Sequence, residues 1–435
     1  MGKLVLSSFQ WMVFILAGTI VAPVSVAYAF GFSAADTATL LQRAFFVVGL
    51  TSMLQGVFGH KLPLMEGPAG LWWGVFLAYA SLVSKSGAEG HAILSSLELG
   101  LMASGALFLF LSAFNLIRFV QKLFSPAVTG IYLILLIIQL SGPFIQGILG
   151  AESGSMDGLT AILAIITLIL SVILSQSKRA FFKNYSVLIS LIIGWVLFIA
   201  FGKADFAMPG GASVVRFPQW LAWGAPSFNL GVFITSLLTA LLLLTNLMAS
   251  VDAVKQVVKP KKQENMRLTN AIMGINQIFA GLFPTVGCVP ISGSAGFILT
   301  TRIKERLPFL IGSALILMLS FFPAVTDLFS DLPAPVGYAT LFVSMASILG
   351  LGIKTVKNEI SNEKKATVIS LSIMVGAGIL LLPQSALSHL PSVVASILHN
   401  GLIVGVVIAM VLDQILARPS KQSIKLARAG ENNKK

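Results

Sequence analysis

The sequence is poor in cysteine, in charged residues and in the motifs of catalysis. Its only cysteine is Cys288, which excludes an internal disulfide. The four histidines lack the spacing of metal ligands, and we find no Walker loop, nucleophile elbow or kinase signature. The sequence therefore predicts neither an enzyme nor an ATP-driven pump, and it predicts no cofactor and no bound metal.

Charged residues make up only 10% of the chain, whereas soluble domains carry about 25%. Hydrophobic residues make up 56%, and the mean hydropathy is +0.91. The net charge of +13 could suggest a nucleic-acid partner, but the basic residues lie in short loops between apolar runs. That arrangement orients membrane proteins. We therefore expect a multi-pass protein of the plasma or inner cell membrane, embedded in the lipid bilayer and binding no nucleic acid.

Fourteen apolar runs are long enough, or nearly long enough, to cross a bilayer. They predict an all-α membrane protein with 14 transmembrane segments. The runs cover about residues 9–30, 42–58, 64–82, 92–113, 124–147, 158–176, 184–201, 229–252, 267–284, 288–301, 306–323, 336–352, 365–383 and 394–416.

The distribution of basic residues supports this count and gives an orientation. If the N-terminus lies in the cytoplasm and the spans alternate, 25 of the 29 basic residues fall on the cytoplasmic side. The outside keeps only Arg43, Lys85, Lys203 and Arg216. Because a wrong number of spans would mix the two groups, we expect both termini to be cytoplasmic.

One short segment occurs twice, and each copy interrupts an apolar run. Residues Glu66–Gly70 match Ser292–Gly296, and the upstream residues 49–58 and 274–283 share the spacing of their glycines. The copies lie in spans three and ten, seven spans apart, so the second enters the membrane from the opposite side. Paired interruptions of this kind in inverted repeats are typical of the binding site of a secondary transporter.

The interrupted spans predict two half-helices, each preceded by a short strand. We expect Leu62–Glu66 to be extended with a helix starting at Gly67 and Pro68, and Val289–Ser292 to be extended with a helix starting at Gly293. Two helix N-termini facing each other would offer backbone donors to a planar ligand with carbonyl groups, or to an anion. Two proline kinks in ordinary helices are the alternative.

Four motifs resemble the nucleobase–cation symporter-2 family, also called nucleobase–ascorbate transporters, which includes uracil and xanthine permeases. They are Gly18–Pro23, Leu62–Gly67, Ser125–Gly130 and the signature half Gly296–Arg302. The resemblance covers about residues 8–416 and implies import of a nucleobase with H⁺ or Na⁺ by a homodimer. It also implies a seven-plus-seven inverted repeat with a core and a gate domain. The implied parts are core residues 1–115 (spans 1–4), gate residues 116–228 (spans 5–7), core residues 229–325 (spans 8–11), gate residues 326–418 (spans 12–14) and a basic cytoplasmic tail, 419–435.

The chain departs from the family pattern at both carboxylates that the resemblance implies. Asn246 takes the place of the span-eight carboxylate, with Ser250 at the polar position one turn later. In span ten the first signature position is Gly293 and the second is Ser294, with Ser292 before them. An amide can read the edge of a base because it donates and accepts, but it cannot take up a proton at neutral pH.

Two other carboxylates could couple transport to an ion. Glu66 lies beside the first interruption, where an ionisable residue within the membrane is a functional candidate. Its alternative role is a structural pair with His60 or Lys61. Asp252 lies close to Lys255, which favours an ion pair at the cytoplasmic end of its span, with ion coupling as the alternative.

The sequence thus predicts a secondary active permease for a purine or pyrimidine base, working by alternating access of the core against the gate. An anion carrier of the same fold, for sulfate or bicarbonate, and an uncoupled facilitator or sensor stay open as alternatives. The predicted substrate-binding residues are Glu66, Gly67, Ala69, Gly70, Asn246, Ser250, Ser292, Gly293 and Ser294, and those for ion coupling are Glu66 and Asp252.

Overall fold

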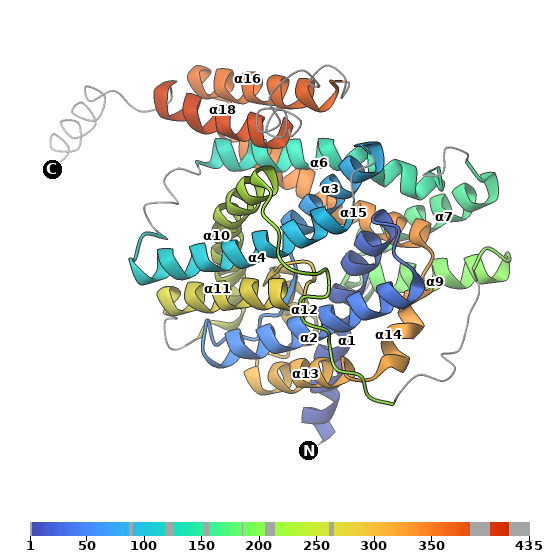
Figure 1. The fold of residues 1–435 in the computed structure, drawn as a ribbon. Helices are drawn as coiled ribbons and strands as arrows, with labels where there is room; N and C mark the ends of the chain where they lie inside the picture. The colour runs from blue at the N-terminus through green and yellow to red at the C-terminus, as the bar shows by residue number, and fades with distance from the viewer. Residues whose placement is uncertain are drawn as a thin grey trace. The chain divides into compact units, whose positions relative to one another are not determined.

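A computed structural model describes residues 2–86, 90–117, 125–151, 156–184, 186–204, 214–260, 265–382 and 401–416. Within these ranges the regular secondary structure is helical (Figure 1) apart from two three-residue strands. The elements before the middle of the chain are α1 (Gly2–Ala29), α2 (Ala34–Val57), β1 (Glu66–Pro68), α3 (Gly70–Ser86), α4 (Gly90–Ala113), α6 (Pro126–Leu149), α7 (Gly158–Ser175), α8 (Ala180–Asn184) and α9 (Ser186–Ala200). Those after it are α10 (Leu230–Val258), α11 (Met266–Leu282), β2 (Cys288–Pro290), α12 (Gly293–Thr301), α13 (Arg306–Leu319), α14 (Pro323–Ser330), α15 (Ala334–Lys357), α16 (Glu363–Leu380) and α18 (Gly401–Leu416).

A helix lies along each of the fourteen apolar runs. By length and composition, seven of the described helices can cross a membrane on their own, or eight spans result if a bent pair counts as one. The chain is therefore a helical protein with several membrane-spanning helices, and the full count of fourteen stays a prediction.

Short polar residues fix where several helices begin. Ser33 caps α2 by accepting from the backbone N–H of Asp36 at 3.2 Å, while its hydroxyl donates to the Asp36 carboxylate at 2.6 Å. This reciprocal cap starts α2 well before the apolar run that predicted it. Asn229 and Asn265 cap α10 and α11 in the same way, each accepting from a backbone N–H three residues later.

The apolar run 306–323 is occupied by α13 and the first residue of α14, which do not form one continuous helix. α13 ends at Leu319, and α14 begins at Pro323 with its axis bent by 81° from that of α13. Pro323 has no N–H to continue a helix and pushes Phe322 into an extended conformation, φ −104° and ψ 100°.

The chain divides into two compact units, with α6 and α15 contributing to both. Unit 1 comprises residues 1–118 and 140–346, and unit 2 comprises residues 119–139 and 347–435. In unit 1, α4 contacts α10 and α11, α11 also contacts α2, and α2 contacts α13 and α1, so these helices lie side by side (Figure 1). In unit 2, α16 packs on α18, where a Cβ on Gly401 would come 2.2 Å from the carbonyl oxygen of Gly376.

The two strands lie inside unit 1. β1 contacts α1 and α2, while β2 contacts α10 and α11. All six strand residues are buried. The helices of unit 1 therefore surround the one part of the described chain where strands replace helix.

The contact between α4 and α11 depends on two facing glycines. A Cβ on Gly274 would lie 2.7 Å from the carbonyl oxygen of Gly105, and a Cβ on Gly105 would lie 2.5 Å from that of Gly274. Because backbone cannot yield as a side chain does, any larger residue here must separate the helices.

We predict that Gly274→Ala destabilises the folded protein by about 1–3 kcal/mol, because the added methyl overpacks the α4–α11 contact. The measurement is the apparent unfolding temperature of purified protein in detergent. Gly350→Ala is the matched control: nothing lies within 4 Å of its Cβ position in helix α15, so it should be neutral or slightly stabilising. Equal unfolding temperatures for both variants would contradict the close packing.

Candidate functional site

The two interrupted segments meet as an antiparallel pair of strands. Glu66 lies opposite Pro290, Gly67 opposite Val289 and Pro68 opposite Cys288. The ladder continues on both sides: the N–H of Ile291 donates to Met65 O at 3.0 Å, and that of Ala69 donates to Gly287 O at 2.8 Å. Residues 218 to 226 positions apart are thus joined through their backbones.

The register explains why both strands tolerate proline. Pairs in an antiparallel ladder alternate between hydrogen-bonded and non-hydrogen-bonded positions. Because Met65–Ile291 and Ala69–Gly287 are bonded, Pro68 and Pro290 fall at positions where the ladder needs no N–H.

The expected helix start at Gly67 and Pro68 is wrong. Both residues belong to β1, and α3 begins at Gly70. The local pattern of glycine followed by proline favours a helix N-terminus, but hydrogen bonds to the distant strand β2 hold this segment extended. The start of α12 at Gly293 agrees with the structure.

The space beside Gly67 is filled by protein side chains. A Cβ there would lie 2.8 Å from Met65 Cε and 2.9 Å from Ile291 Cγ1. Met65 also covers Gly18 on α1, where a Cβ would lie 3.1 Å from the same methyl group. These glycines therefore allow the strand pair to pack closely against α1 in this structure.

Glu66 is fully buried, and its backbone and side chain have different partners. Its N–H donates to Ser52 Oγ at 2.9 Å. Within the described residues neither carboxylate oxygen has a hydrogen-bond partner, although the Asn276 side chain lies beside the carboxylate. The closest cationic candidate is His60, whose Nε2 lies 3.8 Å from Glu66 Oε1.

His60 is oriented by the backbone of its own loop. Its Nδ1 accepts from the N–H of Leu62 at 3.0 Å, so Nε2 carries the proton that faces Glu66. The separation of 3.8 Å is too long for a direct hydrogen bond. Of the two basic neighbours that the sequence offered, buried His60 approaches Glu66, whereas Lys61 is exposed.

Two polar residues that the sequence analysis missed hold the strands from α2 and α11. Ser52 contacts the backbone of Glu66, and Gln277 Nε2 donates to Cys288 O at 2.6 Å. The matched glycines Gly49 and Gly274 place these two residues at equivalent positions of the two copies. Polar side chains at equivalent positions of two apolar spans are a signal in the sequence that could have identified Ser52 and Gln277, and the neighbouring Asn276 as well.

Around α12, the predicted residues divide into buried and exposed. Ser294 is buried, and its hydroxyl accepts from the N–H of Met65 at 3.2 Å, which ties the start of α12 to β1. Ser292 and Gly293 are exposed. Within the described part of the chain, neither the Ser292 hydroxyl nor the Gly293 N–H has a hydrogen-bond partner.

Around α3, Gly70 is half-buried at the first position of the helix, and Ala69 before it is buried, with its N–H used by Gly287. The half-buried start of α3 and the exposed start of α12 are therefore the accessible ends of the strand pair.

α10 packs against both β2 and α12 and carries three predicted residues. Ser250 is buried, and its hydroxyl donates to Asn246 Oδ1 at 3.1 Å, which orients the half-buried amide. Asp252 is 62% exposed and lies 3.7 Å from Lys255 Nζ as an ion pair within one helical turn.

Comparison with known proteins identifies the chain's relatives. Residues 2–385 match the sequence model of the xanthine and uracil permeases, described as "Permease family". The proposed purine permease YwdJ of Bacillus subtilis is 39% identical over 422 residues, which cover 95% of this chain and 96% of YwdJ. The xanthine permease of the same organism is 24% identical, with 95% and 93% covered, and its uric acid permease PucJ is 24% identical, with 96% and 93% covered.

Solved structures show the fold. The transmembrane domain of the cyanobacterial bicarbonate transporter BicA superposes with a TM-score of 0.58 at 15% identity, covering 95% of this chain and 98% of that domain. SLC26A9 superposes with a TM-score of 0.62 at 13% identity, covering 94% and 65%. With helices able to span a membrane and a family match along most of its length, the chain is a multi-pass membrane transporter, not an enzyme, and it belongs to the permease family of the xanthine and uracil permeases.

Proposed function

We propose that this permease is a secondary active transporter for a purine or pyrimidine nucleobase, which it takes up by alternating access. The observation that carries the proposal is the pairing of β1 with β2, followed by α3 on one side and α12 on the other. The relatives named for purine, xanthine and uric acid support the substrate class. A planar base with carbonyl and N–H groups suits a site built from backbone and amides.

In this proposal the base lies against the starts of α3 and α12, next to α10. The Gly293 N–H and Ser292 hydroxyl donate to a carbonyl group of the base, and Gly70 allows its close approach. The Asn246 amide, held by Ser250, donates and accepts along the base edge. Gly67, Ala69 and Ser294 form the supporting layer behind these groups. Side chains fill the space beside Gly67, and the Ala69 N–H and the Ser294 hydroxyl already form hydrogen bonds within the protein.

Glu66 is the proposed position for the coupling ion, H⁺ or Na⁺. An ionised carboxylate buried without a hydrogen bond is costly, so it calls for a compensating positive charge. Glu66 also belongs to the strand on which the base site is built, so ion binding and base binding would act on one element. Asp252, exposed and paired with Lys255, is the weaker candidate for this role.

The proposed architecture is a seven-plus-seven inverted repeat of fourteen spans, with α3 and α12 as half-helices in spans three and ten. The division into core residues 1–115 and 229–325 and gate residues 116–228 and 326–418, with the tail 419–435, belongs to the same proposal. The basic loops put both termini in the cytoplasm, and a homodimer completes the proposed assembly.

One observation favours a second candidate, an anion carrier. The solved structures with this fold include a bicarbonate transporter and an anion transporter, and the exposed start of α12 offers donors to an anion. Sequence identities of 15% or less support a shared fold but not a shared substrate, whereas the relatives named for nucleobases reach 39% identity. The third alternative, an uncoupled facilitator, would transport the base at a rate that does not depend on H⁺ or Na⁺.

We predict that cells expressing the chain accumulate radiolabelled xanthine, uric acid, guanine or uracil above cells carrying an empty vector. An excess of the unlabelled base should abolish the accumulation, whereas bicarbonate and sulfate should not compete. Uptake of sulfate or bicarbonate without uptake of any base would favour the anion carrier instead.

Asn246→Ala should weaken base binding about five- to tenfold, because one or two neutral hydrogen bonds contribute about 1 kcal/mol each. The measurement is equilibrium binding to purified protein in detergent. Gln256→Ala, an exposed amide on the same helix, is the control and should bind normally. Wild-type affinity in the Asn246 variant would place the base elsewhere.

Glu66→Gln should remove the dependence of uptake on pH or Na⁺ while leaving base binding measurable, since the amide keeps the size of the carboxyl group but loses its charge. Glu98→Gln is a matched control, because Glu98 is also a fully buried carboxylate but lies on α4, where the charge of Arg43 acts on it. The Glu98 variant should keep the ion dependence of the wild type. An unchanged profile in the Glu66 variant would exclude Glu66 from coupling.

A further inference from the structure

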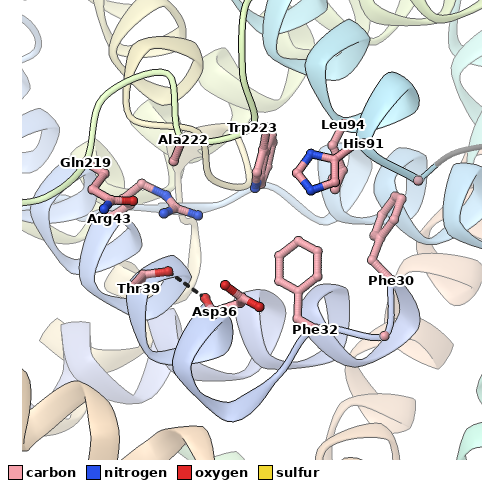
Figure 2. Close-up of a pocket in the computed structure, with 12 residues that line it drawn as sticks. Phe30, Phe32, Asp36, Thr39, Arg43, His91, Leu94, Gln219, Ala222 and Trp223 are labelled. Carbon is pink, nitrogen blue, oxygen red and sulfur yellow. Dashed lines mark hydrogen bonds between the residues drawn. The ribbon is translucent and has the colours of Figure 1, made fainter.

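A cavity of about 380 Å³ in unit 1 is lined by none of the predicted site residues (Figure 2). Its wall comes from the link between α1 and α2, one face of α2, the start of α4 and the segment before α10. The residues that carry its chemistry are Phe30, Phe32, Asp36, Arg43, His91 and Trp223.

Arg43 places a buried guanidinium group at this cavity. The residue is 2% exposed, and its Nε donates to Pro284 O at 2.8 Å. Within the described residues the two terminal nitrogens have no hydrogen-bond partner, and Figure 2 shows the group turned toward the cavity. Its carbon lies 5.9 Å from the centre of the Trp223 ring, a cation–π distance.

Trp223 adds a second unpaired donor. The residue is 5% exposed, its ring packs on Phe76 of α3 at 5.7 Å, and its Nε1 has no hydrogen-bond partner among the described residues. In Figure 2 the indole nitrogen lies at the ring edge nearest the Arg43 guanidinium. A buried N–H without an acceptor costs free energy, which a ligand carbonyl at this point would recover.

The other walls provide an acceptor and aromatic surfaces. The Asp36 carboxylate, one turn before Thr39 on α2, lies between Arg43 and Phe32 in Figure 2. The rings of Phe30, Phe32 and His91 stand around the remaining space. Donors, a carboxylate and aromatic rings together suit a planar heterocycle with carbonyl and N–H groups on its edge. A small inorganic anion would meet Asp36 as a repelling charge and would leave the rings unused.

The cavity is connected to the strand pair through the backbone. Pro284, whose carbonyl holds Arg43, lies in the short link from α11 to β2, and Leu221 N donates to Leu282 O at 2.8 Å in the same region. The sequence-based topology puts residues 31–32, 90–91 and 219–223 on the outer side of the membrane. Residues from all three segments line this cavity.

We propose that this cavity is an outer vestibule site, which binds the transported heterocycle before it reaches the strand pair. The proposal rests on the proposed function and adds a second position for the same class of ligand. Arg43 and Trp223 donate to ring carbonyl groups, Asp36 accepts from a ring N–H, and the phenylalanine rings cover the faces of the base.

The test is the number of sites for radiolabelled xanthine or uric acid on the purified full chain in detergent, measured by equilibrium dialysis. We expect two sites in the wild type. Trp223→Phe keeps a ring but removes the donor, and Asp36→Asn keeps the shape but removes the charge. Each should weaken one site about five- to tenfold and leave the other intact, whereas Asn246→Ala should do the opposite.

Trp195→Phe, a buried tryptophan on α9 outside the cavity lining, is the control and should keep both sites. In uptake assays the two vestibule variants should raise KM with an unchanged maximal rate.

A single site in the wild type, or two sites that neither variant weakens, would overturn the vestibule while base uptake stays intact. Displacement from the outer site by phosphate or bicarbonate but not by bases would overturn its ligand class. Absence of both base binding and base uptake would instead remove the proposed function and the vestibule with it.

Discussion

The structure depends on the need to satisfy backbone polar groups away from water. Within lipid an extended segment has unpaired N–H and C=O groups, which cost several kcal/mol each unless protein satisfies them. Here two such segments satisfy each other as β1 and β2, and side chains from α2 and α11 hold the rest. A single interrupted segment would leave its backbone groups unpaired, so the two interruptions depend on each other.

The same constraint shapes the chemistry beside the strands. The side chains of Ser52, Gln277 and Ser294 form hydrogen bonds to the backbone of the strands or of the residue next to them. The groups left over are the Glu66 carboxylate behind the strands and the Ser292 and Gly293 donors at the exposed start of α12. In the proposed site, one layer of residues therefore holds the strands, and only a few groups are left to contact a ligand or an ion.

Sequence reasoning found the elements but not their pairing. Apolar runs located the helices, and the repeated motif located the two segments that converge. The motif match makes Glu66 equivalent to Ser292, and it gives no register for the ladder, in which Glu66 lies opposite Pro290. Similarity between the two copies indicates a similar local conformation, but strand register is fixed by contacts between distant residues. For the same reason the local sequence at Gly67 and Pro68 predicted a helix start. Ser52, Asn276 and Gln277 were missed because they lie within apolar runs, where the sequence alone does not show what they contact.

The most direct test of the strand pair uses the protein's only cysteine. Cys288 lies opposite Pro68 at a non-hydrogen-bonded position, where Cα atoms approach within the range that a disulfide spans. Pro68→Cys should therefore form an intramolecular disulfide on mild oxidation in membranes, seen as loss of both thiols and as linked fragments after proteolysis. Ala69→Cys, next in the chain but paired with Gly287 instead, should not cross-link. Free thiols in the oxidised Pro68→Cys protein, or equal cross-linking of both variants, would contradict the pairing on which this account rests.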